Sequence, residues 1–143
     1  MAAKSTTLCT QILALLLNAT AIANVADNAA SSPLTNVYLA LHTASPGAGG
    51  NQSTNEAAYT SYARVAIARS SSGFTVASGT ATLTSAVNFP TATGGSETET
   101  YFSVGEAASG ATEIFYFGPL SPTIAVSNGV TPQLTTGTTI TET

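Results

Sequence analysis

The first part of the chain has apolar residues at helical spacing. Leucines and isoleucines recur every three or four positions from Leu8 to Ala19, and Ser5 or Thr6 stands where a helix cap is expected. Further leucines widen the apolar arc, so the helix is expected to be covered on more than one side. Its own domain can provide that cover, or a neighbouring subunit can. The pattern predicts an N-terminal helical segment over residues 1–26.

Beyond Pro33 the period changes from helical to alternating, and β-branched and aromatic residues become frequent. Segments of this kind are separated by Gly, Pro and Asn turn signals. The expected strands are 37–42, Tyr62–Arg69, Phe74–Ala77, Thr80–Phe89, Glu99–Gly105, Glu113–Phe117, Thr123–Val126 and Gln133–Thr141. About eight short antiparallel strands predict a mainly β fold, a β-sandwich or jelly roll, over residues 34–143. With the helix this makes a single domain, 1–143.

Two neighbouring segments, Glu99–Gly105 and Glu113–Phe117, are rich in aromatic residues. A hairpin with cross-strand aromatic pairs is the simplest interpretation. Phe115 and Phe117 share one face while Tyr116 takes the other. Because both faces then carry an aromatic ring, we expect the outer face to be buried too, by an intersubunit contact.

Charge is scarce in this chain. Only 7% of its 143 residues are charged, against about 25% in an average soluble domain, and the net charge is −4. Three basic residues do not support phosphate neutralisation, so nucleic acid is excluded as a partner. A surface so poor in charge is weakly protected against self-association. The single cysteine, Cys9, has no partner for an internal disulfide and is expected to be an inert packing group.

The N-terminus imitates a secretory signal peptide, with Lys4 followed by the apolar run Ile12–Ala23. The run contains Asn18 and Thr20 and is too short to span a bilayer. We therefore expect a retained helix, no membrane partner and a cytoplasmic origin.

No constellation of residues predicts catalysis, metal binding or a cofactor. His42 is the sole histidine, and Asp27, the sole aspartate, lies outside the β region, so neither a zinc site nor a Ser-His-Asp arrangement is expected. His42 is instead expected to be structural. Glu97 and Glu99 resemble a paired-carboxylate motif, but their polar surroundings favour a turn-exposed pair. The glycine run Gly47–Gly50 lacks the lysine and the helix of a phosphate loop. The expectation is a protein that is not an enzyme.

A polar, glycine-rich loop between two strand-like segments carries a resemblance to a known family. The residues are Leu41-His42-Thr43-Ala44-Ser45-Pro46-Gly47, Gly50-Asn51-Gln52, Tyr59, Tyr62-Ala63-Arg64-Val65-Ala66 and Asn88-Phe89-Pro90. In this pattern, LHTAxPGxxGNQ followed by YARVA and NFP, the chain resembles small structural proteins encoded among the virion-assembly genes of tailed bacteriophages. The resemblance covers most of the chain.

The resemblance implies a structural protein of the virion, assembled in the host bacterial cytoplasm. The first interpretation is a capsid cement or decoration protein that forms a homo-dimer or homo-trimer and bridges major capsid protein subunits. The alternative is a tail fibre or tail-associated subunit, and a third is a host-glycan-binding module that uses Tyr59, Tyr62 or the aromatic hairpin as a stacking surface. Arg64 and Arg69 either bond a neighbouring subunit or merely solubilise strand ends. The expected contact residues are Leu8, Ile12, Leu16, Tyr59, Tyr62, Arg64, Arg69, Phe115 and Phe117.

Overall fold

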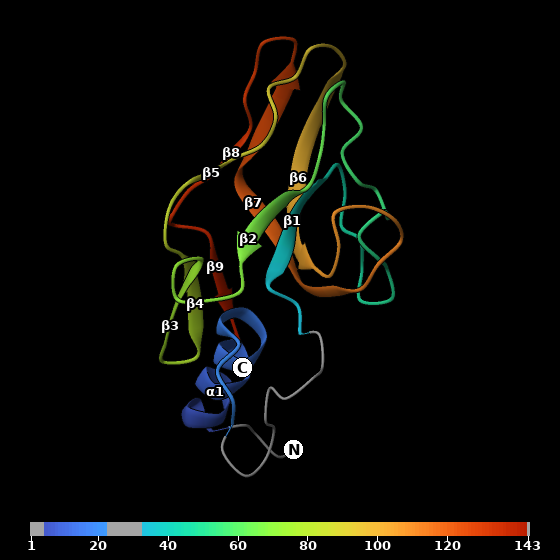
Figure 1. Cartoon of the computed structure of the whole chain (residues 1–143). Coiled ribbons are helices and arrows are strands. Elements are labelled where there is room, and N and C mark those ends of the chain that lie inside the picture. The colour runs from blue at the N-terminus through green and yellow to red at the C-terminus, as the bar shows by residue number, and fades with distance from the viewer. Residues whose placement is uncertain (1–4, 23–32, 143) are drawn as a thin grey trace. The chain divides into compact units, whose positions relative to one another are not determined.

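The computed structural model describes residues 5–22 and 33–142, and this part of the chain is mainly β, as predicted (Figure 1). The elements are α1 (Thr6–Asn18), β1 (Asn36–His42), β2 (Val65–Ala68), β3 (Phe74–Ala77), β4 (Thr80–Leu83), β5 (Val87–Asn88), β6 (Ser96–Gly105), β7 (Ile114–Ser127), β8 (Gln133–Leu134) and β9 (Thr139–Thr141). They form sheets in the orders β2-β1-β6-β7, β3-β4-β9 and β5-β8. The chain divides into two compact units.

The first unit, here called the helical unit, comprises Met1–Asn36, Ala68–Ala86 and Thr135–Thr143. Its helix α1 starts at the predicted cap, because the Ser5 side chain accepts the Leu8 amide at 3.2 Å. It ends at Ala19, which has φ 53°. Residues 1–4 and 23–26 of the predicted helical segment lie outside the described residues. No helix among the described residues is long and apolar enough to cross a membrane.

Helix α1 packs on β3 and β4 of its own unit. Its most buried side chains are Cys9, Leu13 and Leu17, which recur every four residues and so lie on one face. Cys9 is therefore a packing residue, as predicted. In the same unit the Gly79 amide donates to the Thr10 hydroxyl at 2.6 Å, which ties the β3–β4 turn to the helix.

The second unit, here called the sheet unit, comprises Val37–Ile67 and Val87–Leu134. Strands β1 and β6 lie at the centre of its four-stranded sheet, with Leu39 opposite Val104 and Leu41 opposite Phe102. Leu39, Leu41 and Val104 are almost fully buried. Val37, Leu39 and Leu41 share one buried face of β1, as the alternation predicts, but Ala40 and His42 on the opposite face are buried as well.

The predicted separation of Glu113–Phe117 from Thr123–Val126 is wrong. Apart from Glu113, both belong to the 14-residue strand β7, which continues through Pro119 and Pro122. Proline has no backbone N–H to donate to a neighbouring strand. Because β7 lies at the edge of the sheet, with β6 on one side, proline is tolerated there. The predicted hairpin of β6 and β7 is confirmed.

Direct aromatic pairs across this hairpin were also predicted, and the register shows that they do not form. Phe102 lies opposite Gly118, and Phe117 lies opposite Ser103. A Cβ atom at residue 118 would approach the Phe102 ring to 3.2 Å, so the ring occupies the space above the glycine. The register shifts after Val104, which displaces the aromatic residues of the two strands from one another.

Two predicted strands each divide between sheets. Thr80–Phe89 becomes β4 and β5, and Gln133–Thr141 becomes β8 and β9. The divisions fall where the chain passes from one compact unit to the other, after Ala86 and after Leu134. Alternation of side chains continues across such a passage, so the sequence pattern did not reveal it.

Candidate functional site

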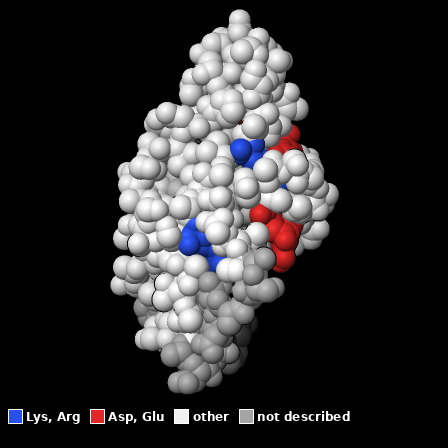
Figure 2. Space-filling model, viewed as in Figure 1, with Lys and Arg blue, Asp and Glu red and all other residues white. Residues whose placement is uncertain are grey.

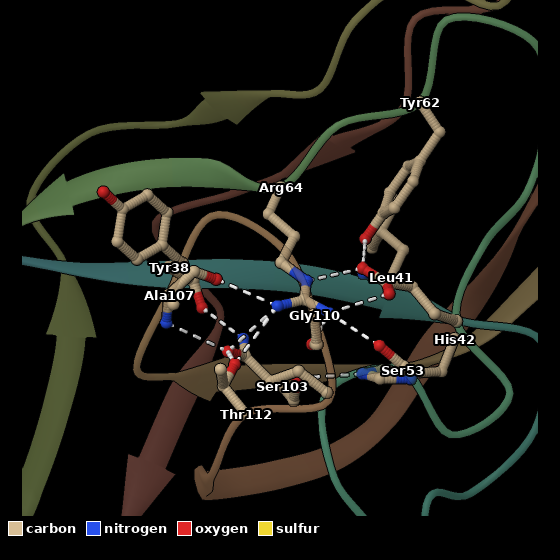
Figure 3. A network of polar contacts seen from close by, with 12 residues as sticks. Tyr38, Leu41, His42, Ser53, Tyr62, Arg64, Ser103, Ala107, Gly110 and Thr112 are labelled. Carbon is tan, nitrogen blue, oxygen red and sulfur yellow. Dashed lines mark hydrogen bonds and ion pairs between the residues drawn. The ribbon is translucent and has the colours of Figure 1, made fainter.

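Polar residues of the sequence motif that runs from Leu41 to Ala66 gather around the buried guanidinium group of Arg64 (Figure 3). Arg64, just before β2, is 7% exposed. Its Nε donates to Glu56 Oε1 at 2.6 Å and its Nη2 to Glu56 Oε2 at 2.8 Å. This two-point geometry fixes the orientation of both side chains and makes the pair stronger than a single contact.

The other donors of Arg64 reach the loop 106–113 between β6 and β7. Nη1 donates to Ala107 O at 2.9 Å, and Nη2 donates to Gly110 O at 2.8 Å. Nη2 also bonds the Ser53 hydroxyl at 3.2 Å. Since Ser53 and Glu56 belong to the loop 43–64 between β1 and β2, one side chain joins two loops that are far apart in sequence.

Gln52 makes a second connection between the same loops and is fully buried. Its Nε2 donates to Tyr38 O at 3.1 Å, and its Oε1 accepts the Thr112 hydroxyl at 2.9 Å. Its backbone amide donates to Thr112 O at 2.9 Å. Any Cβ atom on Gly105 would overlap the Gln52 amide group, so glycine is required beneath it.

His42 extends the network along β1 and is fully buried. Its Nδ1 lies 2.9 Å from Thr54 O and its Nε2 lies 2.8 Å from Ser103 Oγ. Burial lowers the pKa of His42, so the ring is neutral, with Nδ1–H donating to the carbonyl and the serine hydroxyl donating to Nε2. The structural role predicted for His42 is confirmed.

Tyr62 connects the network to the core. Its hydroxyl accepts the Leu41 amide at 3.1 Å and donates to Glu56 Oε1 at 3.1 Å. Burial is the main cause that raises its pKa. The ring stacks on Phe89 with a centroid distance of 6.3 Å and meets Tyr59 edge-on at 5.3 Å. Tyr59 itself is 3% exposed and donates to Pro90 O at 3.0 Å, which is a core position and not an open stacking surface.

This arrangement holds loops in place, and its reactive groups are already engaged. Both ring nitrogens of His42 and both carboxyl oxygens of Glu56 have partners within the chain. Among residues 5–22 and 33–142 there is no group of three or more His, Cys, Asp and Glu side chains that could hold a metal ion. The hydrogen bonds of this network thus hold the loops 43–64 and 106–113 in a fixed conformation.

The other predicted contact residues lie in several places. On α1, Leu8 is 37% exposed while Ile12 and Leu16 are half-buried. On β7, Phe115 is half-buried and Phe117 is 38% exposed. The structure thus leaves part of each apolar set accessible, and contact with a second chain stays a prediction for all of them.

Arg69 lies in the helical unit, where its guanidinium binds the end of α1. Nε donates to Leu16 O at 2.6 Å and Nη2 donates to Leu15 O at 2.6 Å. These are carbonyls of the last helical turns, where a cation is stabilised by the helix dipole. For Arg64 the solubilising interpretation is wrong, because its side chain is buried. Both arginines thus bind groups of their own chain.

Glu97 and Glu99 were expected at an exposed turn, and this expectation is wrong. Both lie in β6, and Glu99 is fully buried. Burial, followed by the neighbouring Glu97 carboxyl, raises the pKa of Glu99 to about 8. The sequence analysis missed this residue, and it also missed the buried roles of Gln52 and Glu56. In a chain with so few charges, an Arg and a Glu within one strand-flanked loop are a usable signal for such a pair.

Comparison with known families identifies the chain. The profile of one family, described as Podophage GP4 fiber I protein gp80, matches residues 3–142. The chain belongs to this family. No curated protein matches it. Membership of this phage fibre family supports the resemblance to virion structural proteins of tailed bacteriophages, and it favours the tail-fibre interpretation over the capsid one.

Proposed function

We propose that this protein is a structural component of a phage tail fibre and acts by binding other virion proteins. The observation that carries the proposal is the match to a fibre I family over nearly the whole chain, residues 3–142. Its partners are then tail proteins, and its location is the virion. Capsid cement, the first interpretation of the sequence, has no specific observation in its favour and is not proposed further.

The buried network supports a structural role. Arg64, Glu56 and Gln52 give the loops 43–64 and 106–113 a fixed conformation through hydrogen bonds between them. Loops held in the bound conformation lose little entropy when they meet a partner. A subunit of an assembled fibre benefits from this because each contact then costs less ordering.

The surface supports protein contact in the same way. In the view of Figure 2, few Lys, Arg, Asp or Glu atoms are visible and the remaining described surface is uncharged. The edge strand β7 carries no charged residue over its 14 positions. Charged residues are depleted in the centres of protein interfaces, so a partner can cover such a surface without desolvating ions.

The experiment is to count and locate the protein in purified virions of the phage that encodes it. Quantitative mass spectrometry gives the ratio of this chain to the major capsid protein, and a gold-labelled antibody gives its position in electron micrographs. The proposal expects a ratio of a few per cent and label on the tail. A near-equimolar ratio with label over the head would overturn it in favour of the cement interpretation.

A further inference from the structure

Two carboxyl groups meet on one face of β6, at its N-terminal end. Glu97 and Glu99 are two residues apart in a strand and so project to the same side. Their partners across the ladder on β7 are Val126 and Ile124, which supply no charge. The pair therefore has no counter-charge from the strand beside it.

Glu97 holds a neighbouring segment of chain. Its Oε1 accepts the Ala58 amide at 2.8 Å and the Tyr59 amide at 2.7 Å. The same segment, residues 57–61, is also bridged to Gly94 through Thr60. Two short bonds to one oxygen are typical of an ionised carboxylate. Glu97 is thus a main attachment of this segment to β6.

Glu99 has a different environment. It is fully buried, and no donor among the described residues reaches either of its oxygens. The two guanidinium groups bond elsewhere, that of Arg64 to Glu56 and that of Arg69 to the end of α1. A buried carboxylate without a donor or a counter-charge is unfavourable, so the neutral acid is the stable form. A neutral acid beside an ionised one can place its proton between them.

We propose that Glu97 and Glu99 share one proton, and that this shared proton keeps the segment 57–61 fastened to β6. Loss of the proton places two negative charges side by side in a buried position, and Glu97 then moves away from the Ala58 and Tyr59 amides. Tyr59 is the titratable group that faces the pair from the segment, and it stays neutral because burial and the two carboxylates raise its pKa to about 12. The inference does not depend on the proposed tail location.

A direct test observes the proton and the two amides in the full chain by NMR. The side-chain carboxyl of Glu99 is expected to titrate near the value of about 8 given by its surroundings. Above that midpoint, the Ala58 and Tyr59 amides are expected to lose about tenfold in hydrogen-exchange protection per pH unit. Each pH unit lowers the protonated fraction of Glu99 by about tenfold, and the segment is fastened only in that fraction. The Gln52 amide, which donates to Thr112 O and lies outside the segment, is the internal reference. Titration of Glu99 near the ordinary glutamate value, or protection of Ala58 and Tyr59 that follows that of Gln52, overturns the proposal.

Variants keep the test decisive. Glu99→Gln mimics the neutral acid, since its amide donates to Glu97, and it is expected to keep the Ala58 and Tyr59 protection constant to pH 9.5. Glu113→Gln removes an exposed carboxylate and is expected to behave as the wild type. If Glu97 and Glu99 hold a cation instead of a proton, addition of calcium or magnesium chloride at pH 9 restores the protection in the wild type and leaves that of Glu99→Gln unchanged. That outcome also overturns the proposal.

Discussion

Removal of the Arg64 guanidinium tests the central structural argument. In Arg64→Met the side chain keeps an apolar stem of similar length, but the Glu56 carboxylate loses its bidentate partner. The side chains of Arg64 and Glu56 are only 2% and 18% exposed, so little water replaces the lost bonds. Breaking such a buried pair costs about 3–5 kcal/mol because a charge is left without compensation.

That loss is a large part of the total, since a domain is typically stable by roughly 5–15 kcal/mol. For a chain of this size, each kcal/mol lowers the melting temperature by roughly 2–4 °C, so a fall of roughly 6–20 °C is expected. Urea unfolding followed by circular dichroism measures the change in free energy. Limited proteolysis is expected to cut first within residues 106–113, because the Ala107 and Gly110 carbonyls lose their donor.

Two further variants separate charge from geometry. Arg64→Lys keeps the positive charge but loses the planar fork, and we expect it to recover only part of the stability. Arg64→Met combined with Glu56→Gln leaves no unpaired charge, so its destabilisation should be smaller than the sum of the two single changes. A cost below about 1 kcal/mol for Arg64→Met, or strict additivity in the cycle, would refute the view that this buried pair fixes the loops.

Three other changes probe separate parts of the chain. Gly105→Ala should destabilise by about 1–3 kcal/mol or more, because its Cβ overlaps the Gln52 side chain, whereas Gly49→Ala, with open space around its Cβ, should be neutral in the same urea titration. His42 is neutral when folded and protonates more readily when unfolded, so its own contribution to stability should fall as the pH drops below about 6.5, while Glu99 contributes with the opposite sign over the same range. The difference in stability between the wild type and His42→Gln should therefore shrink in melting curves from pH 7 to pH 5. Arg69→Met should cost about 1–2 kcal/mol and lower the ellipticity at 222 nm during early unfolding, because the last carbonyls of α1 lose their cation. The glycine argument fails if Gly105→Ala and Gly49→Ala have the same free energy of unfolding. The other two fail if His42→Gln keeps the pH dependence of the wild type or if Arg69→Met keeps its stability.

The local features of the fold could be predicted from the sequence because they depend on short-range chemistry. The Ser5 cap, the start of α1 and the strand Phe74–Ala77 agree with the structure. What was missed depends on neighbours far along the chain. Pro119 and Pro122 ended a strand in the prediction, but they are compatible with β7 because that strand lies at an edge, and sheet order is not written in any local pattern.

The candidate site shows the same limit more sharply. His42 was correctly expected to be structural, yet Arg64 was expected at the surface and Glu99 at a turn. Exposure of a charged residue is a good general rule because burial of an unpaired ion is costly. Arg64 can be buried because its charge is paired with Glu56, and Glu99 can be buried because its raised pKa favours the neutral acid. A chain with few charges has few ways to neutralise them, so each charged residue within a strand or its flanking loop is better interpreted first as half of a buried pair.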